Sequence, residues 1–205
     1  MRSRKVFLYV LLMALALLAC KKSDEAGAEG SPPVAIAFDP EAVLQSSGEV
    51  DVELKLAGDK ATLRAGDANF DLELKGTQVT LSQEGNTVYK LTREADRIKI
   101  RLPDGTVTHK LKFKKDDRLE LEEESGKRLH LSKPKDYGYK VYDGSENELI
   151  AVKQKEKRVE AKRKSGEEVW RIEGVGPKAA SILGYEELKP ELRAALMYML
   201  HRRPA

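Results

Sequence analysis

The chain has 205 residues, of which 40% are hydrophobic and 35% are charged, a composition typical of a globular protein that buries a core. Its 37 Lys and Arg against 34 Asp and Glu give a formal charge of +3. A single Cys excludes an intrachain disulfide framework and a thiolate-rich metal site, and three scattered His residues argue against a histidine metal cluster. We therefore expect neither a bound metal nor a cofactor.

The N-terminus has the features of an export signal. Arg2, Arg4 and Lys5 precede an uninterrupted apolar run of 14 residues, 6–19. This run is shorter than the roughly 17–25 residues that a membrane-spanning helix needs, and it ends in small residues, as a cleaved secretory signal does. The alternative is an uncleaved membrane anchor. We predict that residues 1–19 are a signal peptide.

The sequence Leu17-Leu18-Ala19-Cys20 resembles the lipobox of bacterial lipoproteins. The resemblance implies cleavage between Ala19 and Cys20, a diacylglycerol thioether on Cys20 and acylation of the new N-terminus by a fatty acid such as palmitate. Two or three acyl chains anchor a protein stably, at ~0.8 kcal/mol per buried methylene. Lys21 stands where enteric inner-membrane lipoproteins carry Asp, so the resemblance favours the outer membrane. We expect a lipid-anchored protein of the bacterial cell envelope.

Cleavage changes the charge of the chain. The signal peptide carries three positive charges, and its removal leaves 34 Lys and Arg against 34 Asp and Glu. Residues 20–33 are small and polar and end in two prolines, so we predict a lipidated, disordered tether with a reach of roughly 20 Å. Residues 34–205 are predicted to form a single β-rich domain.

Apolar and polar residues alternate along most of this domain, and a period of two indicates strands with one buried face. Turn dipeptides such as Gly58-Asp59, Gly85-Asn86 and Asp104-Gly105 separate the segments. Spacings near ten residues favour an antiparallel meander, a sandwich or a barrel. Strands are predicted at residues 50–56, 60–65, 68–75, 77–82, 87–92, 97–102, 106–113, 118–123, 127–132, 138–142, 148–154, 157–163 and 167–173.

The C-terminal segment 177–201 is predicted to be helical. Pro177 begins a helix that Gly184 ends, and Pro190 begins a second helix. Residues 194–200 of the second helix are apolar on every side, whereas a surface helix would keep a polar face. We expect the surrounding protein to enclose this helix; the alternatives are a helix that caps an open sheet and an oligomer contact. The predicted fold is mainly β: an antiparallel meander or closed barrel of about a dozen short strands with a buried hydrophobic C-terminal helix.

Many short strands followed by an apolar C-terminal helix resemble the tubby-like C-terminal fold, which includes scramblases and LURP-one-related proteins. Residues 139–152 (YKVYDGSENELIAV) look like its repeated hairpins. The resemblance implies a closed barrel of about a dozen strands around the helix. It further implies a membrane-proximal module that associates with phospholipid, and it transfers no catalytic residue to this chain.

Residues 172–183 (IEGVGPKAASIL) resemble the helix-hairpin-helix signature of DNA-binding proteins. In that motif the backbone N–H groups of a Gly-x-Gly turn approach a phosphate at a helix N-terminus. Gly174 and Gly176 would permit the approach and Lys178 would add charge, giving a possible phosphate-binding turn at residues 174–183. The alternative is a glycine-rich connection between a strand and a helix.

Positive charge gathers in the predicted hairpin at residues 153–164. It forms a candidate anionic-ligand patch, which could sit on anionic headgroups at about 1 kcal/mol per residue. The alternative is a solvated hairpin that uses Lys to prevent aggregation. The acidic residues 120–124 are a candidate counterpart within the fold or in a neighbour. The patch consists of Lys153, Lys155, Lys157, Arg158, Lys162, Arg163 and Lys164.

The sequence contains no phosphate loop, no Gly-x-Ser-x-Gly elbow and no His-Glu-x-x-His motif, so we expect no enzyme. His109 and His130 alternate with apolar neighbours and are predicted to face solvent. His201 is predicted to favour the C-terminal helix end as a cation. Trp170 is expected in the core. We expect a non-catalytic structural role, or the binding of an anionic phospholipid or an envelope protein; the alternative is extracellular DNA binding through the glycine turn and the basic hairpin.

Overall fold

The computed structural model describes residues 41–202 of the chain. The predicted signal peptide and tether, with the cleavage site at Ala19 and Cys20, lie outside the described residues, as do the first residues of the predicted domain.

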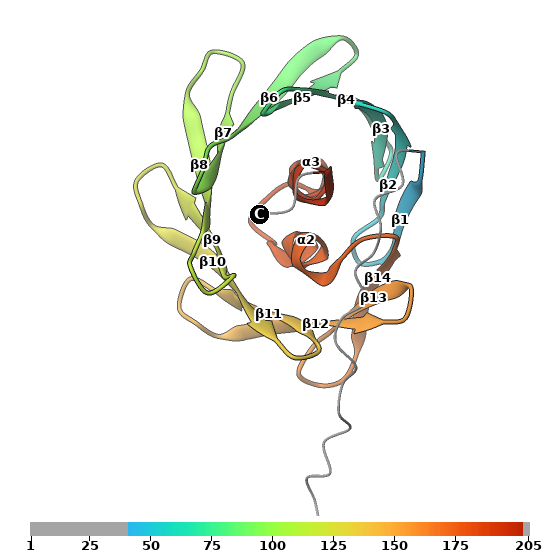
Figure 1. The fold of residues 1–205 in the computed structure, drawn as a ribbon, viewed down its shortest axis with the longest axis vertical. Coiled ribbons are helices and arrows are strands. Elements are labelled where there is room, and N and C mark those ends of the chain that lie inside the picture. Colours follow the sequence, from blue (N-terminus) through green and yellow to red (C-terminus); the bar gives the residue numbers. More distant parts are fainter. Residues whose placement is uncertain (1–40, 203–205) are drawn as a thin grey trace, which may run out of the picture. The chain divides into compact units, whose positions relative to one another are not determined.

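Fourteen antiparallel strands form a closed barrel (Figure 1). Each strand pairs with its neighbours in the chain, and β1 pairs with β14 to close the ring. The prediction of a mainly β fold, an antiparallel meander or closed barrel, is confirmed, and the structure adopts the closed barrel, with fourteen strands rather than about a dozen. The strands are β1 (Val43–Gly48), β2 (Val52–Ala57), β3 (Lys60–Ala65), β4 (Ala68–Lys75), β5 (Gln78–Gln83), β6 (Asn86–Arg93), β7 (Arg97–Arg101), β8 (Val107–Phe113), β9 (Leu119–Glu123), β10 (Arg128–Lys135), β11 (Gly138–Asp143), β12 (Glu148–Lys155), β13 (Arg158–Lys162) and β14 (Glu168–Glu173).

The alternation of the sequence places apolar side chains inside the barrel. Leu54 of β2 lies opposite Leu44 of β1 and Leu63 of β3, and Leu63 lies opposite Phe70 of β4. All four side chains are buried. Because the period is two, the residues between them face outward, and cross-strand apolar pairs of this kind line the lumen.

The sequence did not predict β1, the strand that closes the ring. Its buried positions are Leu44 and the polar Ser46, while Val43 is 55% exposed, so the strand lacks a clear apolar period. The Ser46 hydroxyl accepts a hydrogen bond from the Val52 N–H at 3.1 Å and donates one to the Val50 carbonyl. Gly48 completes the seam, since a Cβ there would lie 2.2 Å from the carbonyl oxygen of Val169 on β14.

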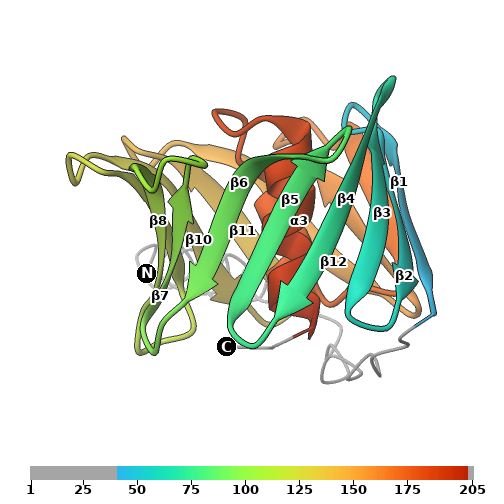
Figure 2. The same ribbon diagram turned by 90° about the horizontal axis from the view of Figure 1, so that it is seen from above.

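A helical hairpin occupies the lumen (Figures 1 and 2). α2 (Pro177–Ala180) continues as the 3-10 helix η1 (Ser181–Gly184), and α3 (Pro190–Arg202) returns beside them. η1 replaces the second half of the α-helix predicted to start at Pro177. All residues from Ala194 to Leu200 are buried, which confirms the prediction of an enclosed apolar helix. α3 contacts β2, β3 and β5, while α2 and η1 contact β11 and β12.

The helical hairpin makes the two ends of the barrel differ, because its connecting loop lies at one end and the C-terminus of α3 at the other. The connection from η1 to α3, residues 185–189, lies at one end, together with the β1–β2, β11–β12 and β13–β14 turns; we call this the loop end. α3 finishes at the other end, where Arg202 donates a hydrogen bond to the carbonyl of Gly58 in the β2–β3 turn at 2.8 Å. We call this the base end.

Charged side chains form cross-strand pairs on the outer face of β8 and β9. Three of these pairs use every second residue along β8 and β9 and the residue that follows each strand. They are Lys112–Glu122 at 2.6 Å, Lys114–Glu120 at 3.0 Å and Lys110–Glu124 at 3.0 Å. The acidic stretch 120–124 therefore pairs with the lysines of β8 and the residue after it, so within the fold it does not meet the basic hairpin. Adjacent β8 supplies the lysines at the matching period of two.

Candidate functional site

A cavity of about 250 Å³ opens at the loop end between the lumen hairpin and the barrel wall. The β1–β2 turn, β12, the β13–β14 hairpin, η1 and α3 all contribute to its wall. It is lined by Glu49, Arg163, Trp170, Gly184, Glu186 and Arg193, together with apolar side chains. Most small-molecule sites are concave and mainly apolar, whereas this cavity is more polar, because four charged side chains contribute to its wall.

Arg193 brings a cation into this cavity from the first turns of α3. Its Nη1 donates a hydrogen bond to the Leu183 carbonyl at 2.9 Å, which fixes the guanidinium against η1. Its Nε–H is buried and has no hydrogen-bond partner among the described residues. Burial lowers the pKa of Arg193, against the opposing effect of nearby carboxylates that include Glu186, but a guanidinium remains a cation at neutral pH.

Trp170 also lines the cavity, and it carries a second buried donor. The side chain is 1% exposed, which confirms that it belongs to the core. Its indole Nε1–H is nevertheless buried with no hydrogen-bond partner in the part of the chain that the structure describes. Most buried polar atoms in proteins are hydrogen-bonded, so two unpartnered donors around one cavity are unusual.

Arg163 and Glu49 close the rim of the cavity. Arg163 donates from Nη1 and Nη2 to the two carboxylate oxygens of Glu49, at 2.6 and 2.9 Å. The hydrogen bond from Arg163 holds the pKa of the Glu49 carboxyl below its ordinary value. The pair neutralises itself and ties β13 to the β1–β2 turn. Arg193, the other arginine that lines the cavity, has no ion pair within 4 Å among residues 41–202.

His130 fixes the loop between η1 and α3. It lies opposite the buried Leu121 and faces the lumen, so the prediction that it faces solvent is wrong. Its ring stacks on Tyr185 with centroids 4.8 Å apart, and its Nε2 contacts the Glu187 carboxylate. The neighbouring inward residue, Ser132, hydrogen-bonds the Tyr185 hydroxyl at 2.9 Å. The alternating Leu131 is also buried, but on the outer face, which is why apolar alternation misplaced His130.

All three histidines are held toward the neutral form. Burial lowers the pKa of His130, although the Glu187 carboxylate opposes this effect. Burial likewise lowers the pKa of His109, which lies opposite the buried Ile100 rather than facing solvent as predicted. His201 at the end of α3 is also buried, and burial lowers its pKa, so the cation predicted to favour the helix end is disfavoured.

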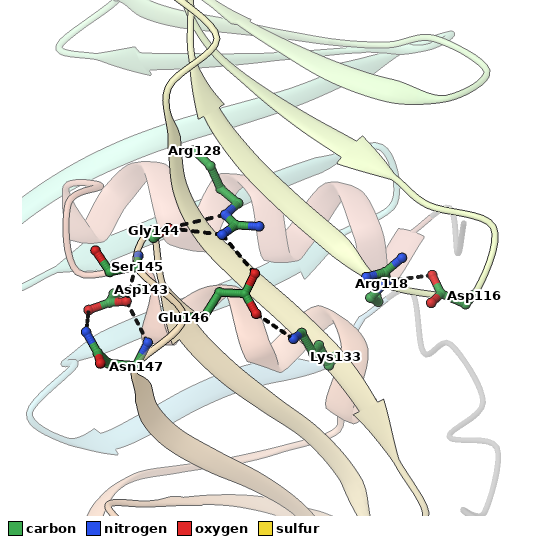
Figure 3. A network of polar contacts seen from close by, with 9 residues as sticks. All are labelled: Asp116, Arg118, Arg128, Lys133, Asp143, Gly144, Ser145, Glu146 and Asn147. Atoms are coloured by element: carbon green, nitrogen blue, oxygen red, sulfur yellow. Dashed lines mark hydrogen bonds and ion pairs between the residues drawn. The ribbon is translucent and has the colours of Figure 1, made fainter.

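The β11–β12 turn at the loop end is held by a dense polar network (Figure 3). The Asp143 carboxylate accepts hydrogen bonds from the backbone N–H groups of Ser145 and Asn147, at 2.9 and 2.8 Å. Together with the Asn147 side-chain amide, these bonds lower the pKa of Asp143. Arg128 reaches across from β10 to the Gly144 carbonyl at 3.1 Å and to Glu146 at 3.0 Å. These bonds fix the backbone of the turn, which borders an open groove of about 530 Å³ that includes Glu187.

The predicted basic patch is divided by the fold. Lys153 and Lys155 lie on the outer face of β12 opposite Glu160 and Arg158 of β13. Glu160 is buried beneath this face and pairs with Arg158 at 2.7 Å and with Lys162 at 3.3 Å. Arg163 and Lys164 lie instead in the β13–β14 turn at the loop end, and Lys157 lies in the β12–β13 turn at the base end.

The predicted phosphate-binding turn lies at the base end. β14 precedes it, where the helix-hairpin-helix motif has a helix. Gly174 takes a positive φ of 73°, and a Cβ there would lie 2.9 Å from the Leu44 side chain, so this glycine allows the chain to turn into the lumen. Gly176 precedes α2, which has only four residues. The Lys178 ammonium contacts the Asp117 carboxylate.

Within residues 41–202 no group of three or more His, Cys, Asp and Glu side chains is arranged to hold a metal ion. None of the helices in this range is both long and apolar enough to cross a bilayer. Comparison with protein-family models, curated proteins and solved structures gives no match for this chain.

Proposed function

We propose that this chain is an exported, lipid-anchored protein of the bacterial cell envelope, whose barrel is a non-catalytic binding module. The anchoring part rests on the charged N-terminus, the apolar run of residues 6–19 and the Leu17–Cys20 lipobox. The polar residues 20–33 would let the barrel sit roughly 20 Å from the bilayer surface.

The observation that carries the binding part is the cavity at the loop end, where the buried Nε of Arg193 and Nε1 of Trp170 lack partners among the described residues. The lumen itself is filled by α2, η1 and α3, whose buried side chains pack against the inner faces of the strands. Binding capacity therefore resides at the surface and the rim. A rigid barrel is a suitable scaffold for such a site, because ordered strands hold the lining residues in place.

The tubby-like resemblance supports the choice of partner. A closed barrel around a C-terminal helix is the architecture that this resemblance implies, although the barrel here has fourteen strands rather than about a dozen. An anionic phospholipid or an envelope protein is therefore the proposed partner. The outward face of β12 and β13, with Lys153, Lys155 and Arg158, offers positive charge to such a partner.

Replacing Cys20 tests the anchor. Cys20→Ala removes the thiol that would carry diacylglycerol, so we expect loss of labelled palmitate and either release from the membrane fraction or accumulation of the unprocessed chain. Ser23→Ala, three residues away in the tether, is the matched control and should remain acylated and membrane-bound. A Cys20→Ala protein that is still processed, acylated and membrane-bound would contradict the proposal.

A further inference from the structure

We propose that the loop-end cavity binds a small oxyanion of the carboxylate or phosphate class, held by the Nε–Nη2 edge of Arg193 and the indole N–H of Trp170. Both residues line the cavity. Nε of Arg193 and Nε1 of Trp170 are buried and have no hydrogen-bond partner in the described part of the chain, so a ligand in the cavity would reach them through a small displacement of the side chains that cover them. The proposal deepens the proposed function by giving the binding module a ligand class.

The guanidinium of Arg193 is oriented for this role. The hydrogen bond from Nη1 to the Leu183 carbonyl occupies one edge of the planar guanidinium. This bond anchors the guanidinium to η1, whose residues are all buried. The opposite edge, formed by Nε and Nη2, remains for a ligand. Two parallel N–H groups on one edge match the two oxygens of a carboxylate or phosphate, and such charge-assisted bonds are roughly twice as strong as neutral ones.

Trp170 restricts the choice of ligand further. An indole N–H is a donor only, so any group that satisfies it must be an acceptor. Arg193 is likewise a donor without acceptor capacity. A ligand that meets both must therefore present acceptor oxygens, and the charge of Arg193 favours an anion over a neutral acceptor.

The described carboxylates around the cavity do not pair with the guanidinium of Arg193. Glu49 is engaged by both terminal nitrogens of Arg163. Glu186 is exposed, and no carboxylate of the described residues lies within 4 Å of the Arg193 nitrogens. A volume of about 250 Å³ admits a small anion or a lipid headgroup. The same oxyanion chemistry comes free in solution or on a phospholipid, and the test separates these sources.

The single tryptophan makes the test direct, since the full-length protein has one indole N–H. The ¹⁵N-labelled protein in non-ionic detergent is titrated with sodium phosphate, with sodium acetate and with dihexanoyl phosphatidylglycerol, at constant ionic strength. We expect a saturable shift of the Trp170 indole resonance. Saturation by phosphate or acetate identifies a free oxyanion as the ligand, and saturation by the short-chain lipid alone identifies a headgroup.

Two variants and a control assign the shift to the cavity. Arg193→Gln should weaken binding at least tenfold, and Arg193→Lys should weaken it severalfold because it keeps the charge but loses the fork. Arg171→Gln removes one charge from the exposed outer face of the same strand as Trp170 and should bind like the parent. Trp170→Phe, followed by calorimetry, should bind at least threefold more weakly.

The proposal fails if the indole shift is linear and unsaturated with all three probes, which is the result for a cavity that holds only water. It also fails if the folded Arg193 variants bind as tightly as the parent. If Arg193→Gln does not fold, Arg193→Lys and Trp170→Phe decide the question. Membrane anchoring is measured separately through Cys20→Ala. The proposal of oxyanion binding and the proposal of a lipid anchor can therefore be contradicted independently of each other.

Discussion

The two ends of the barrel treat their polar groups differently. At the base end, Asp117 contacts Lys178 and accepts a hydrogen bond from the Tyr139 hydroxyl, and Arg202 pairs with Asp59 at 2.6 Å. These contacts tie the lumen hairpin to the β-turns. At the loop end, Arg193 and Trp170 each keep a buried N–H without a partner among the described residues, beside a cavity.

An unsatisfied buried donor costs about 1–3 kcal/mol. The base end also has one, since the buried Tyr198 hydroxyl lacks a hydrogen-bond partner among the described residues, but at the loop end two such donors belong to residues that line one cavity. Proteins place such costs at functional sites and offset them elsewhere. The contacts at the base end stabilise the barrel, and we propose that the unpartnered donors at the loop end serve a ligand.

The largest effect is expected from Leu196→Asp in α3. Leu196 is fully buried in the lumen, and an unpaired carboxylate there would cost on the order of 4 kcal/mol or more, enough to unfold the domain. Val43→Asp makes the same change on the 55% exposed face of β1 and should melt like the parent. Circular dichroism melts of both variants measure the difference; a Leu196→Asp protein with the parent melting temperature would show that the helical hairpin does not support the barrel.

A smaller loss is expected at the seam between β1 and β14. Gly48→Ala would place a Cβ 2.2 Å from the Val169 carbonyl oxygen at a φ of +115°, so the two strands must separate beside Trp170. We expect a cost of about 2–3 kcal/mol in the free energy of unfolding.

Gly58→Ala provides the matched control for the seam. Its φ is +60°, and a Cβ there would meet nothing within 4 Å. Only the backbone penalty of about 1 kcal/mol applies, so chemical denaturation should rank Gly48→Ala clearly below Gly58→Ala. Equal losses at the two positions would mean that the close approach of β14 to Gly48 contributes nothing.

The next effect separates the two ends directly. Lys178→Gln removes a contact with the 57% exposed Asp117 and should lower the free energy of unfolding by about 0.5–1 kcal/mol. Arg193→Gln removes a half-buried cation that lacks an ion pair within the described residues and leaves an amide donor for the Leu183 carbonyl, so it should cost less than Lys178→Gln. Urea titrations of the two variants test this order, and a larger loss at Arg193 would assign it a structural role.

The smallest expected effect is a pH dependence carried by the buried histidines. Burial lowers the pKa of His130 below its ordinary value of 6.5, so the unfolded chain binds protons more readily than the folded one. The stabilising effect is present above pH 6.5 and is lost as the pH falls below it. We expect a lower urea midpoint at pH 5.5 than at pH 7.5, and a smaller difference in His130→Gln. If the difference between the urea midpoints at the two pH values is the same in His130→Gln as in the parent, His130 does not contribute to the pH dependence of stability.

Much of the barrel could be predicted from local chemistry. Thirteen of its strands follow from alternation and turn dipeptides, and the enclosed helix follows from the apolar residues 194–200. The alternation does not predict β1, because the polar Ser46 takes an inward position. It assigns His130 to the wrong face, because Leu131 is buried on the outer face. In both cases the environment across the barrel, which the local pattern does not contain, decides which side chain is buried.

The loop-end cavity could not be predicted from the sequence. Trp170 and Arg193 are separated by most of the helical segment, and only the return of α3 beside η1 brings them to one cavity. Trp170 reads as a core residue, which it is, and its unpartnered N–H is a property of the folded surroundings. The sequence shows the positive charge of the hairpin at residues 153–164. Only the strand register shows that the buried Glu160 neutralises part of this charge.

Thermal unfolding with and without sodium phosphate tests most directly the claim that the two ends differ in role. At ten times the dissociation constant a ligand stabilises by about 1.4 kcal/mol, which should raise Tm by roughly 3–6 °C in a domain of this size. The parent and Lys178→Gln should both show this rise relative to sodium chloride of equal ionic strength, and Arg193→Gln should show only the nonspecific effect of phosphate. Equal shifts in all three proteins would contradict a binding role for the loop end.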